Sequence, residues 1–263
     1  MTGRKLAGII PPMDIVDLRE FYRSRLGHTT RRLIANRLKP RLGSLAGSTV
    51  MGLGFATPYL EDCTGEAERN LAFMLARQGV IHWPDTGPVK SALIDEFDLP
   101  LLESTVDLAL VIHGLELTDA PDEMLKEVWR VLAPQGRLLL VVPNRRGLWA
   151  RFDTSPFGYG QPFSRPQLLG LLRESQFAIA SWSQALFLPP FSRALFLSWA
   201  GVFENLGNRL MPAVSGVVIV EAVKQVYAIS SSKRLRHPRL APSLNPLPAG
   251  RGDSRSAGVR LCF

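Results

Sequence analysis

The chain has 263 residues, of which 46% are hydrophobic and 21% are charged. It is long enough for one α/β domain with an appendage, and its apolar content excludes a chain that is disordered throughout. The formal charge of +8 is uneven: residues 1–50 hold ten Lys/Arg against three Asp/Glu, residues 51–230 fourteen against nineteen, and residues 231–263 seven against one. The middle of the chain is therefore mildly acidic, and the total charge does not by itself indicate a nucleic-acid-binding protein.

Two cysteines exclude a disulfide scaffold and a four-cysteine zinc site. The four histidines lack the spacing of metal ligands, so we expect no metal site. The apolar stretch before Pro11 is too short for a secretory signal. Prolines and Arg193 interrupt the most apolar later stretch, residues 185–203, whereas a spanning helix needs roughly 20 apolar residues. We therefore expect a cytoplasmic protein without a transmembrane segment, in which this stretch forms a buried or an interfacial helix.

The N-terminal part is expected to be helical. Residues 14–26 place apolar side chains at helical spacing, Asp14 can cap the start, and Gly27 interrupts the pattern. A second, basic helix follows to about Leu38, before Pro40. Short apolar strands are then expected at residues 49–53, 69–74 and 91–94.

The clearest pattern is a strand, a helix, a turn and a strand. Residues 106–112 are almost all apolar, as in a strand covered on both faces. Residues 121–132 form an amphipathic helix with Pro121 in its first turn, and a turn at 134–136 leads into the apolar strand 137–142. This βαβ unit requires a parallel sheet with a right-handed crossover. A helix at 165–176 and strands at 177–183 and 216–227, the last as one strand or two half-strands, are expected to follow.

We divide the chain into three parts. Residues 1–42 are expected to form an N-terminal helical extension, and residues 43–230 an α/β domain. Residues 231–263 are rich in proline, serine and basic side chains and have almost nothing to pack, so they are expected to form a disordered basic tail.

In an open parallel sheet, ligands bind beyond the carboxyl ends of the strands, and this rule selects a few candidate positions. The small-residue turn at 52–57 lets a ligand approach the backbone, or is only a tight turn. Asp95 can accept a hydrogen bond from an adenine amino group, or lies in a solvated acidic loop. His113 can contact a ligand or act as a base, or is satisfied by neighbouring backbone. The loop with Trp149 and Phe157 is expected to cover a substrate, or packs in the core.

Several segments carry a family resemblance. LPLLESTVDLALVIHGLEL is followed by DEMLKEVWRVLAPQGRLLLVVPN, which contains Glu127, Arg130 and Gly136. Together with VMGLGFATPYL, these segments resemble the class I S-adenosylmethionine-dependent methyltransferases, specifically the type 11 methyltransferase domain, over residues 49–142. The final GVVIVEAVKQVY resembles the antiparallel strands that end such sheets. The resemblance implies a Rossmann-like doubly wound sheet, mostly parallel with antiparallel C-terminal strands.

The resemblance also implies a site for S-adenosylmethionine, with His113 as the candidate catalytic base. The implied cofactor-binding residues are Gly52, Gly54, Phe55, Ala56, Asp95, Glu96 and His113. Three departures from the family pattern stand out. Gly52 replaces a usual acidic residue, Ala56 replaces a usual glycine, and the strand at 69–74 is not followed by the carboxylate that usually holds the cofactor ribose.

We therefore expect an S-adenosylmethionine-dependent methyltransferase that moves a methyl group to a small acceptor. The missing acidic residues favour an alternative, a catalytically inactive methyltransferase-fold protein with a binding or regulatory role. A third hypothesis assigns function to the basic ends, which would contact nucleic acid or an anionic membrane surface. The expected partner is a small-molecule substrate, without specific nucleic acid and with at most peripheral membrane contact. The sequence does not indicate the acceptor or the oligomeric state.

Overall fold

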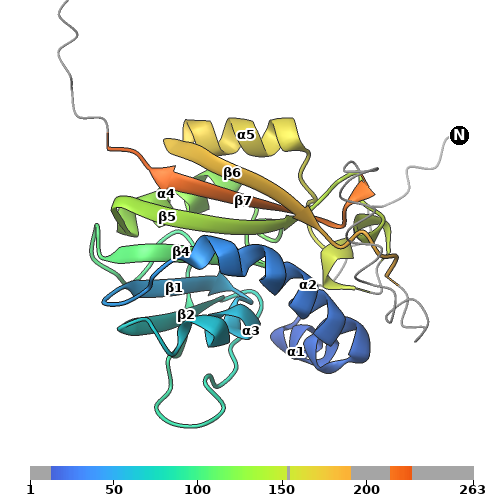
Figure 1. The fold of residues 1–263 in the computed structure, drawn as a ribbon, viewed down its shortest axis with the longest axis horizontal. Coiled ribbons are helices and arrows are strands. Elements are labelled where there is room, and N and C mark those ends of the chain that lie inside the picture. Colours follow the sequence, from blue (N-terminus) through green and yellow to red (C-terminus); the bar gives the residue numbers. More distant parts are fainter. Residues whose placement is uncertain (1–12, 153–154, 191–213, 227–263) are drawn as a thin grey trace, which may run out of the picture. The chain divides into compact units, whose positions relative to one another are not determined.

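A computed structural model describes residues 13–152, 155–190 and 214–226. One seven-stranded sheet runs through these residues in the order β3-β2-β1-β4-β5-β7-β6. Figure 1 shows this order from β2 to β6. The first five strands are parallel, and β7 is antiparallel to both β5 and β6. The expected mostly parallel sheet with antiparallel C-terminal strands is confirmed. The strands are β1 (Thr49–Gly54), β2 (Arg69–Leu75), β3 (Ser91–Ile94), β4 (Val106–Ile112), β5 (Leu132–Pro143), β6 (Phe177–Ala185) and β7 (Val217–Lys224).

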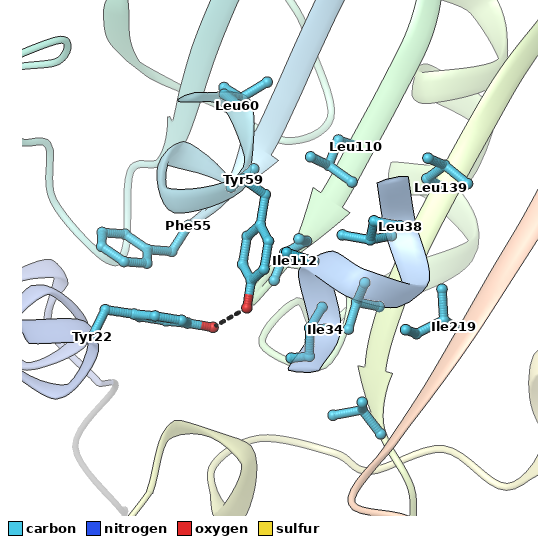
Figure 2. Packing of buried hydrophobic residues seen from close by; sticks show 14 of the residues in the cluster. Tyr22, Ile34, Leu38, Phe55, Tyr59, Leu60, Leu110, Ile112, Leu139 and Ile219 are labelled. Atoms are coloured by element: carbon cyan, nitrogen blue, oxygen red, sulfur yellow. Dashed lines mark hydrogen bonds between the residues drawn. The ribbon is translucent and has the colours of Figure 1, made fainter. Parts of the chain in front are cut away.

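Helices cover both faces of the sheet (Figure 1). On one face, α2 (Arg25–Leu42) and α3 (Thr57–Leu60) bury apolar side chains against the strands. The opposite face is covered by α4 (Pro121–Val131) and α5 (Arg165–Glu174). Both faces of the parallel strands are therefore apolar, as the unbroken apolar runs predicted. Figure 2 shows the packing of α2 on β4, β5 and β7 through Ile34, Leu38, Leu110, Ile112, Leu139 and Ile219.

A short helix, α1 (Ile15–Arg23), precedes α2 and meets it at a corner. The break lies at Ser24 and not at Gly27: Ser24 has extended backbone and caps the end of α1 and the start of α2. Its hydroxyl donates to the backbone oxygen of Phe21 at 2.6 Å and accepts the N–H of Gly27 at 3.0 Å. A Cβ at Gly27 would lie 1.9 Å from the same Phe21 oxygen, so only glycine allows the two helices to approach this closely.

Helix α2 passes through Pro40 and ends at Leu42, which corrects the expected end near Leu38. The proline lies in the last turn, where it removes little of the helical hydrogen bonding. The guanidinium of Arg137 donates to the backbone oxygens of Arg41 and Leu42 at 2.5 Å each. These two bonds satisfy the end of the helix beyond the proline.

Strand β5 begins at Leu132 and includes the turn that was expected at 134–136. Its pairing with β4 shifts register between Val106 and Leu108, and Gln135 has a φ of 65°. The turn is therefore an irregularity within one long strand, because pairing with β4 resumes at Arg137.

Within residues 13–152, 155–190 and 214–226, no helix combines the length and the apolar character needed to cross a membrane. The same residues contain no group of His, Cys, Asp and Glu side chains that could hold a metal ion. The expected basic tail, residues 231–263, and most of the apolar stretch 185–203 lie outside the described residues.

Candidate functional site

The glycine-rich turn after β1 lies directly against the end of β4. Gly54 has a φ of 82° and pairs with Ile112 across the ladder. A Cβ at Gly54 would lie 2.4 Å from the backbone oxygen of Ile112 and 2.7 Å from that of His113. The next residue, Phe55, is 2% exposed and donates its N–H to the Ile112 oxygen at 2.7 Å. The protein's own backbone therefore requires glycine at this position.

Gly52 faces the protein interior. A Cβ at Gly52 would lie 2.6 Å from Leu60 Cδ1 and 2.8 Å from the Cβ of Ala56, and both of these neighbours are buried. The volume beside Gly52 is thus filled by α3 and by the turn that leads into it. An acidic side chain cannot enter this space unless α3 moves away from β1.

His113 and Glu116 form a buried pair just beyond the end of β4. Each side chain is 1% exposed, and His113 Nδ1 lies 3.2 Å from Glu116 Oε1. His113 has a φ of 51°, a left-handed conformation that costs a non-glycine residue about 1–2 kcal/mol. Backbone strain of this kind concentrates at functional sites. The His113 imidazole lies next to the Glu116 carboxylate. Both residues lie at the sheet edge where ligands bind in this class of fold.

Two tyrosines cover His113. The hydroxyl of Tyr22, on α1, lies 2.9 Å from His113 Nε2 and 3.2 Å from the hydroxyl of Tyr59, on α3; Figure 2 shows the two tyrosine hydroxyls meeting. Burial raises the pKa of Tyr22 well above its usual value and also raises the pKa of Tyr59. Both phenols are therefore neutral near pH 7 and act as hydrogen-bond donors or acceptors. The chain of contacts runs from Tyr59 through Tyr22 and His113 to Glu116.

Two buried residues that contact His113, namely Glu116 and Gln78, carry hydrogen-bond acceptors without donors in the described part of the chain. Among the described residues, neither carboxylate oxygen of Glu116 has a hydrogen-bond partner, because its contact with His113 lacks hydrogen-bond geometry. Gln78 is 3% exposed; its Nε2 donates to the His113 backbone oxygen at 3.0 Å, but its amide oxygen has no partner among these residues. Each buried unpartnered group costs about 1–3 kcal/mol, and more when charged. The cluster therefore favours a ligand that brings positive charge or additional donors.

The ends of β2 and β3 hold the other candidate residues. Asp95 is exposed, and its Oδ1 accepts the N–H of Phe97 at 2.9 Å, so its contact with an adenine stays a prediction. Glu96 is buried, lies 3.0 Å from Arg77 Nη2, and accepts the hydroxyl of Thr118 at 3.3 Å. Its carboxylate is thus committed to protein partners. Arg77 itself comes two residues after the end of β2 at Leu75.

Glu127 and Arg130 fix the segment that follows Asp95. Glu127 Oε1 accepts the N–H of Leu99 at 2.8 Å, and Arg130 Nε donates to Glu127 Oε2 at 2.8 Å. Arg130 also donates to the backbone oxygens of Leu99 and Leu101, at 3.1 and 3.0 Å. Glu127 and Arg130, which belong to a segment that carries the family resemblance, therefore tie α4 to the loop after β3.

Glu127→Gln is expected to lower the free energy of unfolding at pH 7 by about 1–2 kcal/mol, because it removes a charge-assisted pair whose carboxylate is 12% exposed. Hydrogen bonding from Arg130 lowers the pKa of Glu127. The stabilisation is therefore present above the ordinary glutamate pKa of about 4.3 and is lost as the pH falls through the lowered pKa. Urea denaturation between pH 7 and pH 3 measures this difference.

The matched control for this prediction is Glu123→Gln, which changes an exposed glutamate in the first turn of the same helix. It is expected to stay within about 0.5 kcal/mol of the wild type. A difference between wild type and Glu127→Gln that did not shrink at low pH would contradict the assigned role of the carboxylate.

The aromatic loop after β5 packs in the core. Trp149 is fully buried and donates from Nε1 to the backbone oxygen of Leu188 at 2.7 Å. Phe157 is 2% exposed, and its ring centroid lies 4.7 Å from that of His113. Both side chains lie in the buried core, with Phe157 against His113 and Trp149 against Phe157, so they are not free to act as a cover.

Four residues of this cluster were not selected from the sequence as site residues. In the sequence, Tyr22 is part of the apolar stripe of a helix, and Glu116 is typical of a residue that begins or caps a helix. No motif in the sequence includes Tyr59 or Gln78 as a site residue. Only the H-x-x-E spacing of His113 and Glu116 was a usable indication, because both follow a strand that ends at the ligand-binding edge of the sheet.

The cluster matches one part of the expected cofactor and not another. S-adenosylmethionine carries an ammonium, a sulfonium and a carboxylate at its amino-acid end, and the two positive groups suit the carboxylate of Glu116, which has no hydrogen-bond partner among the described residues. For the ribose, residues 76–80 directly after β2 contain no carboxylate. Arg77 in this segment pairs with the buried Glu96. The residues therefore fit the cationic end of the cofactor, whereas the usual acidic contact to its ribose is absent.

A comparison with protein families identifies a domain within the chain. Residues 42–140 match the family model described as "Methyltransferase domain". No curated protein matches the chain.

Solved structures share the fold at low identity. An S-adenosylmethionine-dependent methyltransferase from Archaeoglobus fulgidus aligns with a TM-score of 0.54 and 17% identity over 80% of this chain and 100% of its own. One from Thermotoga maritima gives 0.54 and 15%, over 80% and 96%. Geranyl diphosphate C-methyltransferase from Streptomyces coelicolor, in complex with S-adenosylhomocysteine, gives 0.51 and 17%, over 72% and 78%.

At these identities the similarity to solved structures shows only the fold. The family model adds a match in sequence over residues 42–140. Residues 42–140 therefore match a methyltransferase domain model, and the described part of the chain has the fold of the class I S-adenosylmethionine-dependent methyltransferases.

Proposed function

We propose that the protein transfers a methyl group from S-adenosylmethionine to a small acceptor. The observation that carries this proposal is the buried carboxylate of Glu116, which has no hydrogen-bond donor among the described residues and lies at the ligand-binding edge of the sheet. A buried charge is stabilised only by a compensating charge or by donors. The amino-acid end of the cofactor supplies both.

The chain's own residues bind, align and exclude water. When bound, the cofactor supplies a methyl group on a sulfonium, so the protein needs no nucleophile of its own. His113 holds or accepts a proton at Nε2, and the Glu116 carboxylate lies 3.2 Å from the other ring nitrogen, Nδ1. Tyr22 covers Nε2 in the described state, so α1 must shift before an acceptor reaches the imidazole.

We also propose that the protein is cytoplasmic. A cytoplasmic location is supported by the scarcity of cysteine in the sequence. Burial raises the pKa of the Cys63 thiol to about 11, so this cysteine is not a reactive nucleophile.

Isothermal titration with S-adenosylmethionine and S-adenosylhomocysteine tests the proposal, with the variant Glu116→Gln as the key comparison. We expect the wild type to bind both ligands. Glu116→Gln is expected to weaken binding of S-adenosylmethionine by about 10- to 150-fold, because a charge-assisted contact worth about 1.5–3 kcal/mol is lost. The free energy of unfolding without ligand should change by less than about 1 kcal/mol, since the variant keeps the side-chain volume and Glu116 makes no hydrogen bond to the described residues.

The control is again Glu123→Gln, which should change neither binding nor stability. Ligand concentrations must reach the millimolar range, because the missing ribose contact costs affinity. The absence of heat with both ligands at that concentration would contradict the proposal, and so would equal affinities of wild type and Glu116→Gln.

A second candidate is a methyltransferase-fold protein that binds a ligand without methyl transfer. It is favoured by the filled volume at Gly52 and by the Arg77–Glu96 pair beside β2. The same titration separates the two candidates. Failure of both cofactor forms to bind, together with an unchanged melting temperature in their presence, would support the second candidate.

A further inference from the structure

Tyr22 places a phenol against the imidazole of His113. Its hydroxyl lies 2.9 Å from Nε2, and its side chain is contributed by an N-terminal helix and not by the sheet. Tyr22 is 6% exposed. The position that faces His113 is therefore occupied by an aryl hydroxyl of the protein itself.

Other aromatic rings surround the Tyr22 ring, so the space that it fills suits an aromatic ring. Its ring centroid lies 5.5 Å from that of Phe55, 5.3 Å from that of Phe21 and 6.0 Å from that of Tyr59. Such distances are typical of favourable aromatic packing. Apart from the two hydroxyls and His113, the neighbouring rings are apolar. The space thus selects a flat ring that carries one hydroxyl directed at Nε2.

Tyr22 lies on the short helix α1, so an aromatic ligand can displace its side chain from the position beside His113. Helix α1 has nine residues and buries Ile15, Leu18 and Tyr22. Isolated helices shorter than about 12–15 residues are marginal in water, so α1 depends on these contacts. Ser24, the single residue between α1 and α2, has extended backbone at the corner. A competing ring therefore has to displace a short helix and not a strand of the sheet.

We propose that Tyr22 occupies the place of the acceptor, so that the acceptor is a phenol and His113 is the base that takes its proton. This inference rests on the proposed function. The acceptor's O–H bond breaks and its proton passes to His113 Nε2. The oxygen forms a bond to the methyl carbon of the sulfonium donor, and the carbon–sulfur bond breaks with its electron pair remaining on sulfur. The imidazolium then lies 3.2 Å from the Glu116 carboxylate, which compensates its charge.

The test uses Tyr22→Ala in the full chain and p-cresol as the probe, since p-cresol is the side chain of tyrosine. Toluene is the matched probe without the hydroxyl. We expect p-cresol to bind Tyr22→Ala about tenfold or more tightly than toluene and to shift the imidazole NMR signals of His113. With S-adenosylmethionine present, the variant should convert p-cresol to 4-methylanisole. Conversion should be lost in the double variant Tyr22→Ala/His113→Gln.

A second variant keeps Tyr22 and moves its helix. Gly27→Ala places a Cβ 1.9 Å from the Phe21 oxygen and should push α1 away, whereas Gly170→Ala, also in a helix, has nothing within 4 Å and serves as the control. We expect Gly27→Ala to bind p-cresol about tenfold more tightly than Gly170→Ala does. This comparison stands even if Tyr22→Ala does not fold.

The outcomes separate this inference from the proposed function. Equal affinities for p-cresol and toluene, or no 4-methylanisole in a variant that binds S-adenosylmethionine, would overturn the phenol site. Failure of wild type and variants to bind S-adenosylmethionine would instead overturn the proposed function, and the two-probe comparison would still decide whether the site prefers a phenol.

Discussion

Gly54→Ala is expected to lower the free energy of unfolding by about 2–5 kcal/mol, because it combines a left-handed backbone with a clash against two carbonyl oxygens. Gly54 has a φ of 82°, and a Cβ there would lie 2.4 Å from the Ile112 oxygen and 2.7 Å from the His113 oxygen. These oxygens belong to the last residue of β4 and to the residue after it, and β4 cannot move away without breaking its ladder with β1. Urea denaturation followed by circular dichroism measures the loss.

Gly47→Ala is the matched control for the left-handed backbone. Gly47 has a φ of 73°, but a Cβ at this residue would meet nothing within 4 Å, so its substitution should cost only about 1–2 kcal/mol. A loss at Gly54 no greater than the loss at Gly47 would contradict the close approach of the β1 turn to β4.

Gly52→Asp is expected to lower the free energy of unfolding by about 3–5 kcal/mol, because it forces an unpaired charge into a filled interior. The new Cβ would lie 2.6 Å from Leu60 and 2.8 Å from Ala56, so α3 would have to leave β1. By sequence alone, the same substitution restores the usual acid of the family and should strengthen cofactor binding. By structure, no gain in cofactor affinity is expected.

Gly65→Asp is the control, since Gly65 is exposed and has nothing within 4 Å. It should stay within about 0.5 kcal/mol of the wild type. Thermal unfolding and cofactor titration of both variants provide the comparison. A stable Gly52→Asp protein that bound S-adenosylmethionine more tightly than the wild type would show that the Leu60 packing is replaceable and that this account of the loop is wrong.

Periodicity and apolar runs predicted most of the fold. Strand β4 and helix α4 carry strong local patterns, because one is covered on both faces and the other buries a single stripe. The extension of α2 beyond Pro40 was not predictable in this way, since it depends on Arg137, which is distant in sequence. Tertiary contacts outweighed the local signal there.

The candidate site was only partly predictable for a related reason. His113 was selected because it follows a strand at the ligand-binding edge. Its partners Tyr22 and Glu116 looked like parts of helices, since only the folded chain brings α1 over the end of β4. Gly52 and Gly54 were selected as cofactor residues, but their lack of a side chain is explained by contacts within the protein.

We propose that the cluster of Tyr22, His113 and Glu116 is a closed form of the cofactor site. A crystal structure of the protein grown with millimolar S-adenosylhomocysteine tests it most directly. We predict that the ammonium of the ligand lies within hydrogen-bond distance of the Glu116 carboxylate and that the Tyr22 hydroxyl has left His113 Nε2. A crevice still filled by Tyr22, without ligand at Glu116, would contradict the claim.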